Sequence, residues 1–201
     1  MVSIITHMGR RFSRAFTIRC GILFLFGLGY LTLPAAQADV VAKGDTGFNL
    51  VISADTTASP QSAYRGFLNI GDWWIDSHTW FGDASGLYIE PFSGGCFCER
   101  AGEKNTLHML VTQVIPGSEI HMTGGLGPLQ MMGIHGGMSW SFKQSEPGKT
   151  TITQTYNVTG FSVDGLADLA AIVDKVQTQQ THALVQYLNG LPGNNPTLGS
   201  Q

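Results

Sequence analysis

Large apolar side chains share one face of several alternating, strand-like runs in this sequence of 201 residues. Every second residue is apolar along residues 137–143, and the same parity along 150–158 carries a glutamine and a tyrosine. A tryptophan-rich segment covers residues 73–80. Aromatic rings and flexible methionines suit a pocket for an apolar ligand. We expect the ligand-binding residues to be Trp73, Trp74, Trp80, Met122, Met138, Trp140, Gln154 and Tyr156.

Each of these side chains could instead fill the core of the protein. Gln154 is the most informative of them, because its parity with Ile152 and Tyr156 directs an amide into the interior. A buried amide must form hydrogen bonds. Its partner could be a ligand, Tyr156 or a water molecule.

Two cysteines, Cys96 and Cys98, lie two residues apart on a predicted strand, so both thiols face the same side. In an extended chain their Cα atoms are about 6.6 Å apart, which is close to the upper limit for a disulfide. A bridge requires a local bend, and Gly94-Gly95 at the start of the strand allows one. The sequence leaves open a disulfide, a reactive or metal-binding pair, and two inert buried thiols.

The remaining reactive side chains occur only as fragments of catalytic or metal-binding arrangements. Methionines and His135 in residues 131–138 resemble a Cu(I) site, but a glycine-rich loop of this kind also suits a flexible cover over a cavity. We predict no metal and no cofactor. His78, His108 and His121 have no spacing that demands acid–base chemistry, and common hydrolase, zinc and phosphate-loop motifs are absent. Catalytic residues are not assigned.

The elements that must position these residues follow one another in a simple order. Ser59-Pro60 is a good helix start, and the stripe from Leu166 to Leu188 has helical spacing, with Asp164 as a candidate cap and Gly190 as the stop. The pattern predicts a strand over 48–54, a short helix over 61–68, an irregular helical stretch over 73–80, strands over 87–92, 95–100, 106–115, 119–123, 137–143 and 150–158, and the long final helix.

Several of these segments together resemble the START and polyketide-cyclase superfamily (SRPBCC). They are the first strand, the Ser59-Pro60 helix, Trp73-Trp74, the Gly94-Gly95 strand through Glu99, the Trp140-x-Phe142 strand, the Thr150-Thr151-Ile152-Thr153 strand and the leucine-rich last helix. The resemblance implies an α+β helix-grip fold, in which a curved antiparallel sheet of about seven strands wraps around a long C-terminal helix, with two short helices after the first strand. It also implies a cavity for lipids, sterols, polyketides or other apolar molecules.

The first 38 residues are predicted to be a removable signal peptide. Four arginines precede an apolar run over 20–31, Pro34 breaks that run, and Ala36-Gln37-Ala38 supplies small residues before a cleavage site after Ala38. The alternative is a membrane anchor, but about a dozen apolar residues fall short of the roughly twenty that span a bilayer. We therefore expect a periplasmic or secreted domain over 39–190, with residues 39–46 frayed, and a flexible tail over 191–201.

Charge excludes some partners and leaves the function open among three classes. The signal removes four of the eleven Lys and Arg, so seven remain against fourteen Asp and Glu, a net charge of −7. We expect no nucleic-acid partner and at most transient membrane contact, and the oligomeric state is not predicted. The expected function is exported binding of an apolar small molecule or lipid. The alternatives are a polyketide cyclase or dehydrase-type enzyme with Tyr156, Gln154 or His121 handling protons, and a partner-binding domain without ligand.

Overall fold

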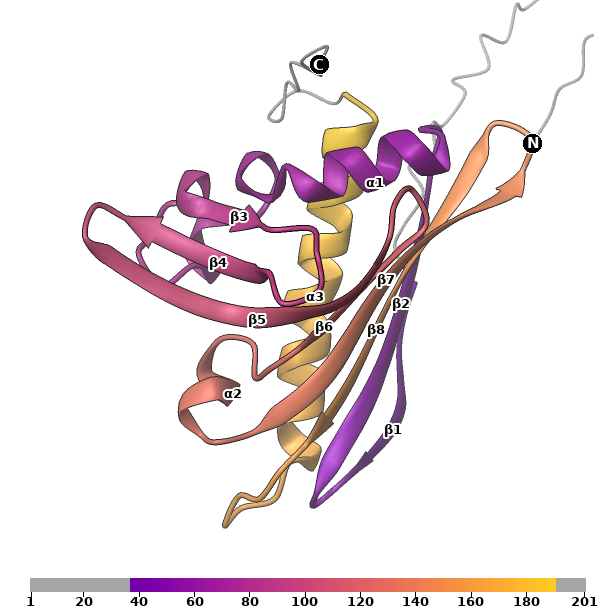
Figure 1. Cartoon of the computed structure of the whole chain (residues 1–201). Coiled ribbons are helices and arrows are strands. Elements are labelled where there is room, and N and C mark those ends of the chain that lie inside the picture. The colour runs from indigo at the N-terminus through magenta and orange to yellow at the C-terminus, as the bar shows by residue number, and fades with distance from the viewer. Residues whose placement is uncertain (1–36, 191–201) are drawn as a thin grey trace, which may run out of the picture. The chain divides into compact units, whose positions relative to one another are not determined.

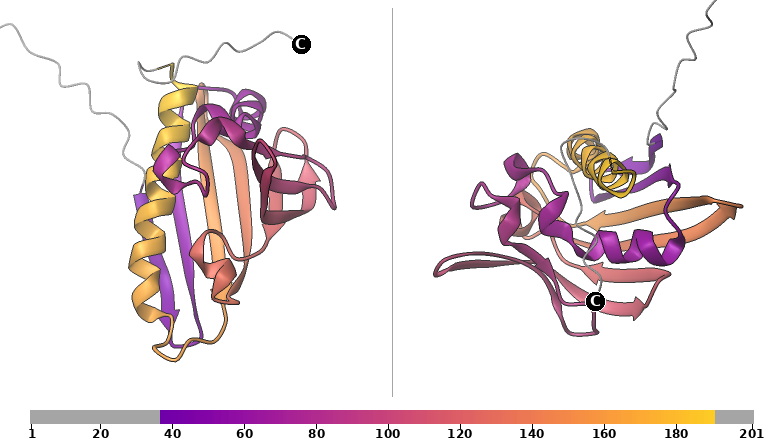
Figure 2. Two further views of the ribbon diagram at one scale, coloured as in Figure 1. Left: turned by 90° about the vertical axis from the view of Figure 1, so that its left-hand side faces the viewer. Right: turned by 90° about the horizontal axis from the view of Figure 1, so that it is seen from above.

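A single curved sheet and one long helix make up most of the computed structural model, which describes residues 37–190. The predicted tail and the predicted signal peptide up to residue 36 lie outside the described residues. Eight antiparallel strands form the sheet in the order β1-β2-β8-β7-β6-β5-β4-β3, and the long helix α3 lies across it (Figures 1 and 2). No helix among the described residues is long and apolar enough to cross a membrane.

The predicted elements occur in the predicted order along the chain. The strands are β1 (Gln37–Gly44), β2 (Gly47–Thr56), β3 (Leu87–Ile89), β4 (Cys96–Ala101), β5 (Lys104–Ile115), β6 (Glu119–Thr123), β7 (His135–Glu146) and β8 (Lys149–Thr159). The helices are α1 (Pro60–Leu68), α2 (Pro128–Met131) and α3 (Ala167–Leu188), and three short 3-10 turns span Ile70–Asp72, Asp76–His78 and Ala84–Gly86.

Strand β1 corrects the prediction that residues 39–46 are frayed. It pairs with β2 from Gln37↔Ser53 to Gly44↔Gly47, at the edge of the sheet. The apolar residues Val40, Val41 and Ala42 are consecutive, so no alternation marks the strand, and the backbone hydrogen bonds that hold an edge strand leave no sequence pattern. With β1, the sheet has eight strands, where the sequence predicted about seven.

The ends of the helices were predicted with mixed success. The Ser59 hydroxyl accepts a hydrogen bond from the Ser62 N–H at the start of α1, as expected. The prediction that Asp164 caps α3 is wrong: Leu166 is the capping residue, and its N–H donates to the carbonyl of Asp45 in the β1–β2 turn. The tertiary contact therefore replaces the side-chain cap.

Alternation in the central strands directs one face of the sheet into the core, as predicted. Ile152, Gln154 and Tyr156 of β8 are buried, and so are Met138 and Trp140 of β7. The segment over 73–80 is a loop with one 3-10 turn and not an irregular helix. Its backbone is held by specific hydrogen bonds, described below, which local propensity does not encode.

Candidate functional site

A cavity of about 360 Å³ lies against the first half of α3. The helix supplies one wall through residues at three- and four-residue spacing, namely Leu169, Ile172, Val173, Val176 and Gln177. All but Gln177 are apolar. The helical stripe therefore serves two purposes, since its C-terminal half packs in the core and its N-terminal half bounds the cavity.

Three other segments complete the walls of this pocket. They are Trp74 with the loop residues 77–80, His108 of β5, and residues 126–129 with Met132 around α2. Trp80, Met132 and Ile172 are large apolar side chains with exposed fractions of 44%, 43% and 61%. Because they are both exposed and part of the lining, they form the mouth of the pocket.

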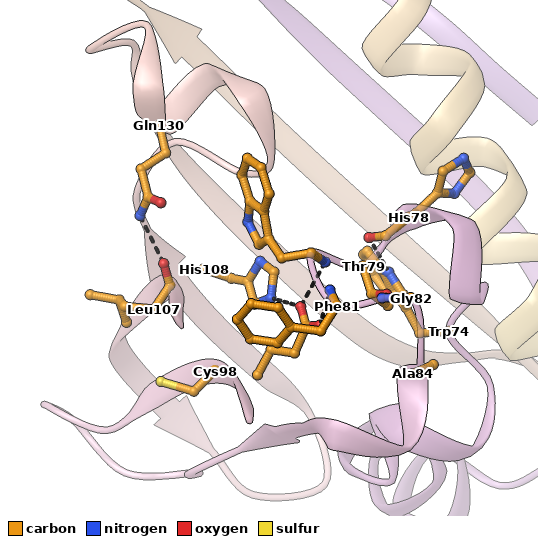
Figure 3. A network of polar contacts seen from close by, with 12 residues as sticks. Trp74, His78, Thr79, Phe81, Gly82, Ala84, Cys98, Leu107, His108 and Gln130 are labelled. Atoms are coloured by element: carbon orange, nitrogen blue, oxygen red, sulfur yellow. Dashed lines mark hydrogen bonds and ion pairs between the residues drawn. The ribbon is translucent and has the colours of Figure 1, made fainter. Parts of the chain in front are cut away.

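Hydrogen bonds fix the backbone of the loop over 74–84. The Trp74 indole N–H donates to the carbonyl of His78 over 3.1 Å, and the Thr79 hydroxyl accepts from the Gly82 N–H (Figure 3). The Thr79 hydroxyl also donates to the Asp76 carbonyl. The Ile75 N–H donates to the side chain of Gln180 in α3 over 3.1 Å. The bond from Ile75 to Gln180 ties the loop to the helix that forms the opposite wall of the pocket.

Of the eight residues predicted to bind ligand, Trp74 and Trp80 line the pocket. The other six, Trp73, Met122, Met138, Trp140, Gln154 and Tyr156, are buried and are not part of its lining. Phe67 packs against two of these buried residues: its ring centroid lies 6.0 Å from that of Trp73 and 5.0 Å from that of Trp140. Aromatic packing fills this part of the interior.

A buried carboxylate, Glu99 on β4, receives three hydrogen bonds beside the pocket. The backbone N–H groups of Trp80 and Phe81 donate to its two oxygens over 2.9 and 2.8 Å. Nε2 of His108 lies 3.0 Å from Oε2. Because a carboxylate only accepts, Nε2 carries the ring proton. Glu99 thus positions both the pocket loop and the His108 ring.

A β-bulge turns His108 into the interior. The pairing of β4 with β5 steps from Phe97↔Met109 to Cys98↔Leu107, so His108 is an extra residue in the ladder. Strict alternation from the buried Met109 would place His108 on the outer face. The bulge instead buries both side chains. No feature of the sequence marks this irregularity, although the parity of Glu99 with Phe97 does place a carboxylate inside.

The other ring nitrogen of His108, Nδ1, is buried and has no hydrogen-bond partner among the described residues. The ring stacks on Phe97, with centroids 4.7 Å apart and an interplanar angle of 25°. Burial lowers the pKa of His108 from its ordinary value, while the hydrogen bond to Glu99 and the charge of that residue act in the opposite direction. The ring is therefore neutral near pH 7, and Nδ1 is an unused acceptor.

We predict that acidification below pH 6.5, the ordinary pKa of histidine, destabilises the protein in part through His108. Because the pKa of His108 is lower in the folded state, the unfolded chain binds more protons between the two pKa values. The free energy of unfolding therefore decreases as the pH is lowered through that window. The contribution of neutral His108 to the free energy of unfolding is fully present above the ordinary pKa of histidine. Urea unfolding from about pH 8 to about pH 5 measures it, and His108→Phe should flatten the profile. An unchanged profile in the variant would contradict the prediction.

Three buried polar side chains connect β8 to α3. Gln154 Nε2 donates to Gln177 Oε1 over 2.6 Å, and the Thr181 hydroxyl lies 3.0 Å from the Gln177 carbonyl and 3.4 Å from Gln154 Oε1. The inward amide predicted at Gln154 therefore finds its partner on the helix. Gln177 in turn lines the pocket, so this network is continuous with the cavity wall.

Replacing Gln154 by leucine should cost about 2 kcal/mol of unfolding free energy, because Gln177 then keeps a buried acceptor without its donor. The double variant Gln154→Leu/Gln177→Leu should recover most of the loss, since both partners become apolar. Urea unfolding of the two single variants and the double variant completes the cycle. Additive losses would show that the two side chains act independently.

Tyr156 anchors the loop after β6. Its hydroxyl donates to the Gly124 carbonyl over 3.2 Å and accepts from the Leu126 N–H over 3.0 Å. Burial raises the pKa of Tyr156 to about 12. The hydroxyl is thus committed to two backbone groups and keeps its proton at neutral pH, and Leu126 is held where it lines the pocket.

In the structure, Cys96 and Cys98 are joined in a disulfide with Cα atoms 5.5 Å apart. This separation is shorter than that of a fully extended chain, and the register shift of β4 against β5 falls between Phe97 and Cys98. The bulge that turns His108 inward therefore lies opposite the bridged segment.

Among the remaining candidate residues, His121 and His135 lie apart from the pocket lining, whereas His78 and Met132 are part of it. His121 alternates with the buried Ile120 and Met122, and Nε2 of His121 lies 2.6 Å from Oε1 of Glu119. His135 forms a hydrogen bond with the Thr123 hydroxyl. Within residues 37–190, no group of three or more His, Cys, Asp or Glu side chains is arranged to hold a metal ion.

Solved structures resemble this chain, although no family model and no curated protein matches it. A conserved protein of unknown function from Enterococcus faecalis, EF2215, has a TM-score of 0.50 at 14% identity, covering 82% of each chain. CalU16 from Micromonospora echinospora has a TM-score of 0.50 at 12% identity, covering 80% of this chain and 76% of its own. DynU16, from the dynemicin biosynthetic locus, has a TM-score of 0.51 at 13% identity, covering 73% of this chain and 49% of its own.

The protein has the helix-grip fold. The curved antiparallel sheet, the long C-terminal helix and these likenesses together confirm the α+β architecture predicted from the sequence. At identities of 12–14% they establish the fold alone. A helix-grip fold is suited to a ligand cavity between sheet and helix, and the pocket described above lies against that helix.

Proposed function

We propose that this protein is exported and binds an apolar small molecule or lipid in the pocket against α3. The pocket itself is the observation that carries the proposal, because its walls are mainly aliphatic and aromatic and its mouth exposes large apolar side chains. At a packing density of about 0.74, a cavity of about 360 Å³ accommodates roughly 270 Å³ of ligand, which corresponds to about 20 non-hydrogen atoms.

The geometry favours binding over the cyclase-type reaction suggested by the resemblance. The Tyr156 hydroxyl is held by two backbone groups, and the Gln154 amide is bonded to Gln177. His121 is not part of the pocket lining. The three expected proton handlers are therefore engaged or lie elsewhere. An open, mainly apolar pocket also favours a ligand over the third alternative, a partner-binding domain without one.

Native mass spectrometry of the full-length gene product, expressed in a host that processes export signals, tests both parts of the proposal. We expect a chain beginning at Asp39 in the exported fraction, carrying a stoichiometric apolar adduct that organic solvent extracts. Retention of residues 1–38 would overturn the export. An adduct-free protein whose melting temperature is unchanged by a panel of lipids and polyketides would overturn the binding.

A further inference from the structure

We propose that the ligand carries a hydroxyl group, which donates a hydrogen bond to Nδ1 of His108. The inference rests on the binding function proposed above and names the polar group that an otherwise apolar ligand must have. Its starting point is that His108 bounds the pocket and holds a buried acceptor without a partner among the described residues.

An unpaired buried acceptor is uncommon, because it costs the free energy of desolvation without a compensating hydrogen bond. Three other described residues hold a buried, unpaired oxygen, and none of them lines the pocket. Among the described residues, His108 alone both lines the cavity and holds a buried polar atom without a hydrogen-bond partner. A bound molecule is the natural source of its missing partner.

The chemistry of the missing partner follows from the orientation of the ring. Glu99 accepts from Nε2, so the neutral ring presents Nδ1 only as an acceptor, and the ligand must donate. The surrounding walls are mainly apolar, and they would desolvate an ammonium group at high cost. A neutral hydroxyl meets both conditions. The negative charge of Glu99 strengthens Nδ1 as an acceptor through the ring.

A small movement at the mouth must accompany binding, because Nδ1 has almost no accessible surface. Trp80 is the residue placed to move, since it lines the same pocket and is 44% exposed. Glu99 holds the backbone N–H of Trp80 and the ring of His108 at once. The loop backbone can therefore stay fixed while the indole turns toward solvent.

Three fluorescent probes of the right size class separate the hydroxyl from the apolar surface: 1-hydroxypyrene, 1-methoxypyrene and pyrene. Titration of the wild-type protein should show about tenfold tighter binding of 1-hydroxypyrene than of 1-methoxypyrene, as expected for one added hydrogen bond to a buried acceptor. His108→Phe keeps an aromatic ring against Phe97 and removes the acceptor, so the two affinities should become equal. The ¹⁵N resonance of Nδ1 in the wild-type protein should shift with 1-hydroxypyrene alone.

The matched control is His121→Phe, which alters another His–Glu pair outside the pocket and should preserve the tenfold preference. Equal binding of the three probes to the wild-type protein, with no change at Nδ1, would overturn the hydroxyl inference and leave the binding function intact. Binding of none of them would overturn both. If His108→Phe does not fold, the wild-type affinities and the Nδ1 resonance still decide between these outcomes.

Discussion

Replacing Glu99 by alanine should lower the free energy of unfolding by at least about 3 kcal/mol, since each buried donor left without its acceptor costs about 1–3 kcal/mol. Three donors lose their acceptor at once: the backbone N–H groups of Trp80 and Phe81, and Nε2 of His108. All three lie beside the pocket, so ligand binding should fail together with stability. Urea unfolding at neutral pH measures the loss.

The control for Glu99 is Glu119 on β6, whose carboxylate also contacts a histidine. The Glu119 side chain is 29% exposed and its partner His121 is 37% exposed, so solvent competes for both. Glu119→Ala should therefore cost less than about 1 kcal/mol. Similar losses at the two positions would show that the burial of Glu99 and its backbone hydrogen bonds add nothing to the contact with histidine.

Much of the fold could be predicted because alternation and helical spacing are long-range patterns along the chain. Residues 150–158 alternate strictly, and the structure pairs them in register with both β2 and β7. Strand β1 and the four-residue helix α2 were missed for the opposite reason. Strand β1 lacks alternation of apolar and polar residues, and α2 is a single turn, so neither carries a pattern long enough to identify it.

The site was harder to predict than the fold, because parity tells which side chains point inward and not where space remains. Trp140 and Trp73 point inward as expected, but with Phe67 they fill the interior. The open volume lies instead against Leu169 and Val173, near residues that look unremarkable in the sequence. The inward position of His108, to which we assign the ligand contact, depends on a bulge, which is a feature of pairing and not of composition.

Filling the pocket from α3 should strongly weaken binding without unfolding the protein. Val173 and Val176 are three residues apart on the helix and both line the cavity, so Val173→Trp/Val176→Trp places two indoles in the volume that a ligand would occupy. We expect the affinity for pyrene to fall about a hundredfold, equivalent to about 2.7 kcal/mol, because the ligand must displace packed side chains. Fluorescence titration measures the affinity, and urea unfolding should show no loss of stability.

The matched control for this double variant is Val41→Trp, which adds an indole on β1 at a position that is 59% exposed and outside the pocket lining. It should leave the affinity for pyrene unchanged. Since the pocket walls are mainly apolar, the two indoles bury apolar surface there, which stabilises the folded state. The filled variant should therefore unfold at the same or a higher urea concentration. Unchanged affinity in a folded, filled variant would place the binding site elsewhere and would remove the basis for a role of His108.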